Sequence, residues 1–137
     1  MNSSELRIGN YVKAVIERDC DITELIGRVS QISEDGVWLT NLKNDKGIKF
    51  GIGDIFPILL TEDIFRHLDY RESFYGDFYC IGENGMCHIY HQDDGFVFKI
   101  SPTYRVPFEF VHELQNFYYA LTYKELNVEV EWLRYIL

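Results

Sequence analysis

A row of uncharged hydrogen-bonding side chains marks one predicted helix near the C-terminus. His112, Gln115, Asn116 and Tyr119 occupy positions i, i+3, i+4 and i+7, so they share one side of a helix. A solvated helix face usually carries charged residues such as Lys and Glu instead. A row of this kind suits recognition by hydrogen bonds, and we take these four residues as a candidate partner-binding site.

The same row has a structural interpretation. In a small protein built from two lobes, the four side chains could seal the junction between the lobes and satisfy buried backbone groups. Histidine as a residue type can change its charge near neutral pH, which is why His112 could be considered as a general base. However, no Ser or Cys in the sequence stands in a nucleophile context, so we assign no catalytic residue. Binding and packing stay open as alternatives.

A second group of residues has some of the chemistry of a metal site. Cys80, Cys87, His88 and His91 lie close together in the sequence, and a hairpin could place Cys80 opposite Cys87. Their spacing, C-x6-C-H-x2-H, matches no standard zinc pattern, and free cysteines are commonly buried as small apolar groups. We therefore expect no metal and no cofactor, and keep as an alternative a small metal-binding or hydrolytic protein that uses His88, His91 and His112.

Composition limits the class of protein. The chain has 137 residues and a formal net charge of −9, which opposes binding to a nucleic-acid backbone. Its N-terminus resembles no signal peptide, no apolar run approaches membrane-spanning length, and its three cysteines form no zinc-finger spacing. We expect a cytoplasmic protein with a protein partner, without membrane or nucleic-acid binding. The ten Tyr, ten Phe and two Trp are expected to be core residues first.

The first 60 residues read as short strands separated by turns. The expected strands are 8–16, 26–32, 36–42, 47–50 and 52–58. Gly27 permits a bend, the three-residue step from Val29 to Ile32 implies a β-bulge, and Asp35-Gly36 suits a tight hairpin turn. Five such strands resemble SH3-type barrels. The expected inward-facing residues are Ile8, Val12, Val29, Ile32, Val37 and Leu39.

The remaining residues predict helices around a meander. Thr61 is expected to cap a short helix that buries Ile64, Phe65 and Leu68. The expected strands are 73–81, 86–91 and 96–100, with a last edge strand at 127–132. Pro107 is expected to open the long helix, which should end near Tyr123. The apolar stripe of that helix consists of Phe110, Val111, Leu114, Phe117, Tyr118 and Leu121.

Three motifs carry a resemblance. They are the R-I-G-N-Y-V sequence at 7–12, the P-I-L-L-T-E sequence at 57–62 and the V-H-E-L-Q-N-F-Y-Y-A-L-T sequence at 111–122. Together they resemble a family of short uncharacterised proteins from Bacteroidetes-type genomes and their prophages. That family has Gln where Glu113 stands and Gly where Tyr123 stands. The resemblance implies a phage or mobile-element context and no catalytic activity.

These observations predict an α+β protein with an SH3-like five-stranded barrel at 1–60. A lobe at 61–137, with a short helix, a three-stranded antiparallel meander and a long helix, is expected to pack on it. The expected function is that of a non-enzymatic protein-interaction module. An acidic nucleic-acid mimic that inhibits a host DNA-binding protein is an alternative, because the net charge is strongly negative.

Overall fold

The computed structural model describes residues 1–66, 70–72, 79–81, 87–92, 95–99 and 105–128. It is a mixed α+β structure in which strands predominate. The described residues divide into two compact units, one from Met1 to Ile58 and the other from Leu59 onward. We describe each unit by itself.

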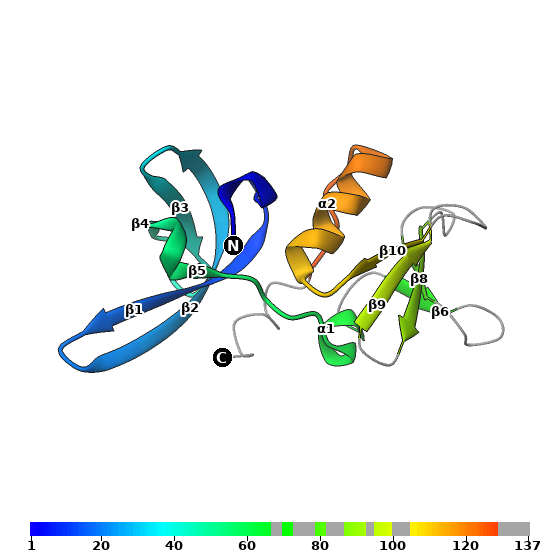
Figure 1. Ribbon diagram of the computed structural model, residues 1–137, viewed down its shortest axis with the longest axis horizontal. Coiled ribbons are helices and arrows are strands. Elements are labelled where there is room, and N and C mark those ends of the chain that lie inside the picture. Colours follow the sequence, from blue (N-terminus) through cyan, green and yellow to red (C-terminus); the bar gives the residue numbers. More distant parts are fainter. Residues whose placement is uncertain (67–69, 73–78, 82–86, 93–94, 100–104, 129–137) are drawn as a thin grey trace. The chain divides into compact units, whose positions relative to one another are not determined.

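The first unit is built around a five-stranded antiparallel sheet (Figure 1). Its strands lie in the order β4-β3-β2-β1-β5, so each strand from β1 to β4 pairs with the next one in sequence and β5 returns to β1. The elements of this unit are η1 (Ser3–Glu5), β1 (Tyr11–Arg18), β2 (Asp21–Ser33), β3 (Gly36–Asn41), β4 (Gly47–Phe50), η2 (Ile52–Asp54) and β5 (Ile55–Phe56).

The bend in β2 follows from two local features. The register between β2 and β3 shifts between Val29 and Gln31, which confirms the predicted bulge. At Gly27, a Cβ atom would lie only 2.9 Å from the Cβ atom of Leu39, so glycine allows the two strands to approach closely. Together these features keep Val29 and Ile32 on the core side of the sheet.

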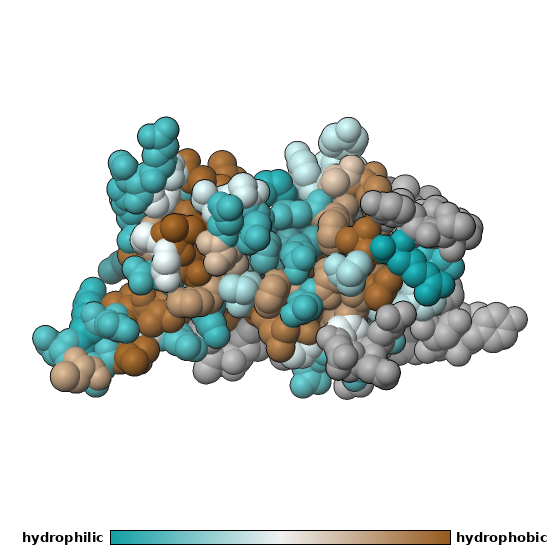
Figure 2. Space-filling view, in the orientation of Figure 1, coloured by the Kyte–Doolittle hydropathy of each residue, from teal (hydrophilic) through white to brown (hydrophobic). Residues whose placement is uncertain are grey.

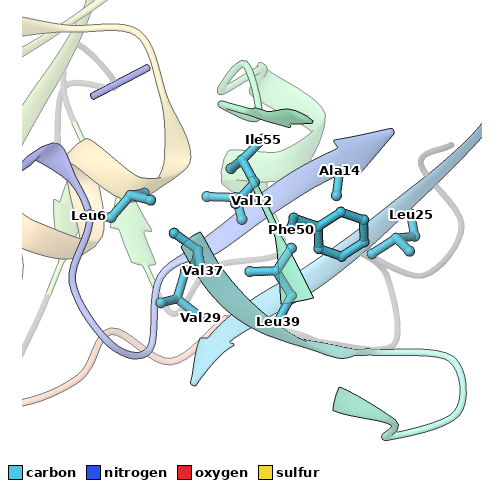
Figure 3. Packing of buried hydrophobic residues seen from close by; sticks show 9 residues of the cluster. All are labelled: Leu6, Val12, Ala14, Leu25, Val29, Val37, Leu39, Phe50 and Ile55. Atoms are coloured by element: carbon cyan, nitrogen blue, oxygen red, sulfur yellow. The ribbon is translucent and has the colours of Figure 1, made fainter. Parts of the chain in front are cut away.

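Small aliphatic side chains make up most of this core (Figure 3). Of the six predicted core residues, Val12, Val29, Val37 and Leu39 are fully buried, and Ile32 is partly buried against the cluster. The clustered residues are Leu6, Val12, Ala14, Leu25, Val29, Val37, Leu39, Phe50 and Ile55.

The prediction for Ile8 was wrong, because its side chain is 59% exposed. The strand does not begin at Ile8; residues 7–10 form a turn instead. Asn10, which is buried, closes this turn with two hydrogen bonds. Its side-chain Oδ1 accepts from the backbone N–H of Arg7 at 2.7 Å, and its backbone N–H donates to the Arg7 carbonyl at 3.0 Å. The turn leaves Ile8 facing solvent.

The predicted barrel closure is not found. Within the described ranges, β5 pairs only with β1, and β4 only with β3. The strand expected at 52–58 is reduced to the two residues of β5, because the short 3-10 helix η2 occupies the preceding residues. The first unit is therefore an open five-stranded sheet in the part that the structure describes.

The connection between the first two strands also differs from the prediction. The sequence predicted strands at 8–16 and 26–32, but β1 and β2 are longer and pair continuously down to Arg18 and Asp21. Only Asp19 and Cys20 form the turn, and both have positive φ, 47° and 74°. Two such residues are typical of a type I′ turn, for which Asn-Gly is the usual sequence. Without a glycine the hairpin gives no clear signal in the sequence.

The second unit contains another five-stranded antiparallel sheet, in the order β10-β9-β8-β7-β6 (Figure 1). The predicted three-stranded meander corresponds to β7, β8 and β9, and the strands β6 and β10 flank it. The elements of this unit are α1 (Glu62–Arg66), β6 (Tyr70–Glu72), β7 (Tyr79–Ile81), β8 (Cys87–Gln92), β9 (Gly95–Lys99), β10 (Arg105–Phe108) and α2 (Val111–Thr122).

The helix starts show one confirmed prediction and one error. Thr61 caps α1, because its Oγ1 accepts a hydrogen bond from the Ile64 amide at 3.2 Å. Pro107 does not open the long helix; it lies in β10, opposite Val97. Because β10 is an edge strand, a proline there need not remove a hydrogen bond from the ladder. Leu68 and most of the strand expected at 127–132 lie outside the described residues.

Aromatic rings make up a large part of the core of the second unit, beside aliphatic side chains such as Ile89 and Leu114. Phe65 stacks on Phe96 with 5.5 Å between the ring centroids. The ring centroid of Phe117 on α2 lies 5.7 Å from that of Phe98 on β9 and 6.0 Å from that of Phe108 on β10. These contacts hold α2 against the sheet. The prediction that aromatic residues serve the core first is confirmed for these five rings.

Candidate functional site

Helix α2, which carries the predicted row, has defined ends. At its start, the Glu113 Oε1 atom accepts hydrogen bonds from the amides of Glu109 and Phe110 at 3.2 and 3.1 Å. At its end, Tyr123 adopts the left-handed conformation, and its amide donates to the Tyr119 carbonyl at 2.8 Å. The helix stops at the predicted place although the usual glycine is absent.

The structure divides the predicted row into two pairs. His112 and Gln115 are buried, with exposed fractions of 3% and 1%. Asn116 and Tyr119 are partly exposed. The His112 ring also stacks on Phe110, with 5.9 Å between the centroids and 12° between the planes. For His112 and Gln115 the packing alternative therefore holds, and of the four residues only Asn116 and Tyr119 present surface to a partner.

The apolar stripe needs a related correction. Val111, Leu114 and Tyr118 are buried as expected, but Leu121 is exposed. The covered arc of the helix is therefore shifted towards His112 and Gln115 and away from the C-terminal end of the predicted stripe. Helical periodicity predicts which residues share a face, but not how far the covering elements extend around the helix.

Sequence analysis overlooked one residue of this helix end. The Tyr123 side chain is 82% exposed, and its ring meets that of Tyr119 edge to face, with 6.4 Å between the centroids and 73° between the planes. Asn116 and Tyr119 are spaced i and i+3 on the helix and share one side of it, and the ring contact places Tyr123 beside Tyr119. We call these three residues the helix-end face. A tyrosine at a helix stop, where glycine is the usual residue, was the signal that could have revealed it.

The structure does not bring the two β8 histidines to one face of the sheet. His88 and His91 are three positions apart on a regular strand, so their side chains point to opposite faces of the sheet. His91 is engaged by other groups, since its Nδ1 lies 2.7 Å from the Glu62 Oε1 and its ring stacks on Phe96 at 4.8 Å.

The cysteine pairing also differs from the expected one. Cys80 lies opposite His88, and Cys87 lies opposite Ile81, which is one residue away from the predicted pairing of the two cysteines. The residues described contain no group of three or more His, Cys, Asp or Glu side chains that could hold a metal ion. The only cysteine side chain that the structure describes, Cys20, is exposed in the turn between β1 and β2.

Comparisons with other proteins add no assignment. No family model, no curated protein and no solved structure matches the chain. None of the helices in the described ranges is long and apolar enough to cross a membrane.

Proposed function

We propose that this protein is a non-enzymatic protein-interaction module that uses the helix-end face, Asn116, Tyr119 and Tyr123, as a contact surface. The observation that carries the proposal is the exposed Tyr123 ring at the end of α2. In the same proposal, the sheet β1–β5 is a variant of the SH3-type arrangement, and the protein acts in the cytoplasm in a phage or mobile-element context.

The Tyr123 side chain is not explained by local stability. A residue with a Cβ atom in the left-handed conformation costs about 1 kcal/mol relative to glycine, and Tyr123 has a φ of 57°. Its ring is almost entirely in solvent, so core burial does not offset this cost. A side chain that departs from the locally preferred residue, without a packing role, is typical of a functional position.

The chemistry of the helix-end face fits a protein partner. Tyrosine is enriched at protein interfaces because it combines a large apolar area with a hydroxyl group that hydrogen-bonds at low conformational cost. Two neighbouring tyrosines already hold each other edge to face, which limits the entropy lost when a partner binds. Asn116 adds a hydrogen-bonding amide one helical turn before Tyr119.

The buried residues His112 and Gln115 hold the helix that carries the helix-end face. His112 and Gln115 lie on the covered side of the first turns of α2, where they fix the rotation of the helix. In this proposal they serve packing, and the partner contacts only the exposed residues that follow. The acidic-mimic alternative would need a continuous row of carboxylates along one face.

Site-specific photo-crosslinking tests the proposal. A photoreactive phenylalanine analogue is placed at Tyr119, and at Glu34 in the first unit as an exposed control position. The protein is then irradiated in extracts of its source cells. We expect one protein to be crosslinked from position 119 and not from position 34. Equal products from both positions would contradict the proposed face.

The variant Tyr123→Gly separates binding from folding. Glycine relieves the left-handed strain, so the melting temperature should stay equal or rise, while the crosslink from position 119 should be lost. Leu121→Ala is the matched control, because Leu121 is exposed on another side of the same helix turn and its loss should leave the crosslink intact. A Tyr123→Gly protein that crosslinks as the wild type would remove the proposal.

A further inference from the structure

The β1–β2 hairpin extends beyond the strands that neighbour it (Figure 1). Strand β2 pairs with β1 from Asp21 to Arg28, but with β3 only from Gly27 to Ser33. In the part of the chain that the structure describes, residues 21–25 therefore have no strand on the side that faces β3. We call this stretch the open edge. An isolated two-stranded ribbon is only marginally stable in water, so a third strand would strengthen it.

The backbone of β2 shows which groups point to the open edge. The Val29 amide donates to the Asn10 carbonyl, and the Val29 carbonyl accepts from the Gly9 amide, both at 2.8 Å, so Val29 faces β1. The Ile26 carbonyl instead accepts from the Leu42 amide at 3.2 Å on the opposite side.

Backbone groups in a strand alternate in direction from one residue to the next. The pairing of β1 with β2 is regular from Asp21 to Arg28, so the alternation continues from Ile26 towards the turn. The N–H and C=O groups of Ile22 and Glu24 therefore point to the open edge, as those of Ile26 do. These two residues offer a ready ladder to an incoming strand.

The side chains of the hairpin end determine what kind of strand could add. Every residue of 17–24 is exposed, and Ile22 is 69% exposed. Glu17, Asp19, Asp21 and Glu24 supply four carboxylates against the single cation Arg18. Figure 2 shows this end covered mainly by hydrophilic residues, with apolar area among them. Glu24 also lies 4.0 Å from the Lys13 ammonium at the base of the hairpin.

We propose that the open edge binds an extended, basic segment of a partner protein, which adds to β2 as a further strand. The segment pairs with the backbone of Ile22 and Glu24. Its apolar side chains lie on the face of the ribbon that carries Ile22, and its alternating lysine or arginine side chains lie on the opposite face, which carries Asp21. Strand addition of this kind takes affinity from the backbone and specificity from alternate side chains. The inference rests on the proposed function as an interaction module, and names a second contact surface and its partner chemistry.

Charge also decides against a second copy of this chain as the occupant. Two hairpin ends with an excess of carboxylates repel each other, and charged residues on edge strands are a common protection against self-association. The same charges attract a cationic strand. Protection against self-association does not explain why Ile22 is apolar. An edge that only prevented association would carry a polar side chain at so exposed a position.

The test uses the full-length protein and a fluorescein-labelled heptapeptide of alternating lysine and valine, with fluorescence anisotropy at physiological salt. A peptide of alternating glutamate and valine controls for charge. A lysine–valine peptide with N-methyl groups on the residues that would face the edge keeps its charge but cannot pair. We expect saturable binding of the first peptide only, with affinity at least about tenfold above that of the N-methylated peptide, because hydrogen bonds are lost.

Two charge variants distinguish the open edge from general attraction to an acidic protein. Asp21→Asn with Glu24→Gln should weaken peptide binding severalfold. Glu34→Gln with Asp45→Asn changes the net charge equally at exposed positions elsewhere in the first unit and should have a clearly smaller effect. Tyr123→Gly should leave peptide binding unchanged, so failure here is separable from failure of the helix-end face.

Four results would overturn the inference: no binding, equal binding of the N-methylated peptide, equal effects of the two charge variants, or a dimer in light scattering that Ile22→Pro dissociates. The variant Ile22→Pro loses the N–H that points to the open edge. It keeps every N–H that pairs with β1, so the hairpin should persist. Circular dichroism of that variant checks this. In the variant, the lysine–valine peptide should bind as weakly as its N-methylated form does to the wild type.

Discussion

The two units of this protein differ in how much aromatic rings contribute to their cores. In the first unit, Val12, Val29 and Val37 represent a core of small aliphatic residues. In the second unit, rings such as Phe98 and Phe108 contact one another from strand to strand and from strand to helix. Both units contain a five-stranded antiparallel sheet, so strand number does not explain the difference.

What covers each sheet does explain it. The first sheet bends at Gly27 and at its bulge, where the strands approach closely, and its core cluster holds Phe50 beside eight aliphatic side chains. The second sheet is covered by α2, and packed layers lie about 10 Å apart. Phenylalanine rings are long enough to span that gap, and each buries a large apolar area. The larger share of phenylalanine in the second core thus goes with the packing of a helix on its sheet. The following predictions test this comparison.

The largest effect is expected at the centre of the first sheet. Val29→Asp places a carboxylate among fully buried aliphatic side chains, which costs several kcal/mol against a total stability of about 5 to 15 kcal/mol. Hydrogen exchange monitored by mass spectrometry should show loss of protection in peptides from β1 to β4. Gln31→Asp adds the same charge on the exposed side of β2 and should remain folded. A wild-type exchange pattern for Val29→Asp would contradict the core assignment.

The second effect is expected in the aromatic core. Phe98→Ala removes a ring that contacts both Phe108 and Phe117, and should lower the free energy of unfolding by about 3 to 5 kcal/mol. Urea unfolding followed by circular dichroism measures it. Phe56→Ala, at an exposed phenylalanine of the first unit, is the control and should cost far less. Equal losses would mean that the rings do not carry the second core.

A smaller loss is expected from the buried polar pair on α2. Gln115→Ala removes a buried amide and should lower stability by about 1 to 3 kcal/mol, because its partners are left unsatisfied. Asn116→Ala, at the adjacent and partly exposed position, should cost less and should weaken the crosslink from position 119 instead. The opposite pattern would reverse the assignment of packing to Gln115 and of binding to Asn116.

The smallest effect is expected at the contact between Glu62 on α1 and His91 on β8. Glu62→Gln removes the carboxylate that lies 2.7 Å from the His91 ring. Because both side chains are well exposed, the coupling free energy should be at most about 1 kcal/mol. A double-mutant cycle with His91→Gln isolates it from the stacking of His91 on Phe96. A coupling of several kcal/mol would show that this contact, and not only the aromatic core, holds α1 in place.

Local sequence determined much of this structure by itself. The Thr61 cap, the β-bulge after Val29 and the stop of α2 near Tyr123 were all predicted, because each depends on hydrogen bonds or side-chain alternation within a few residues. Periodicity likewise placed His112, Gln115, Asn116 and Tyr119 on one helix. It could not separate them into a buried pair and an exposed pair.

Tertiary structure alone decided that separation, together with the exposure of Ile8 and the length of the β1–β2 hairpin. Burial depends on which other elements lie against a face, and those elements come from distant parts of the chain. Propensity also failed at the hairpin turn, where the pairing of two long strands holds Asp19 and Cys20 in a conformation that usually needs glycine. The physical reason is common to these cases: many weak contacts made at long sequence separation outweigh the small local preferences of single residues.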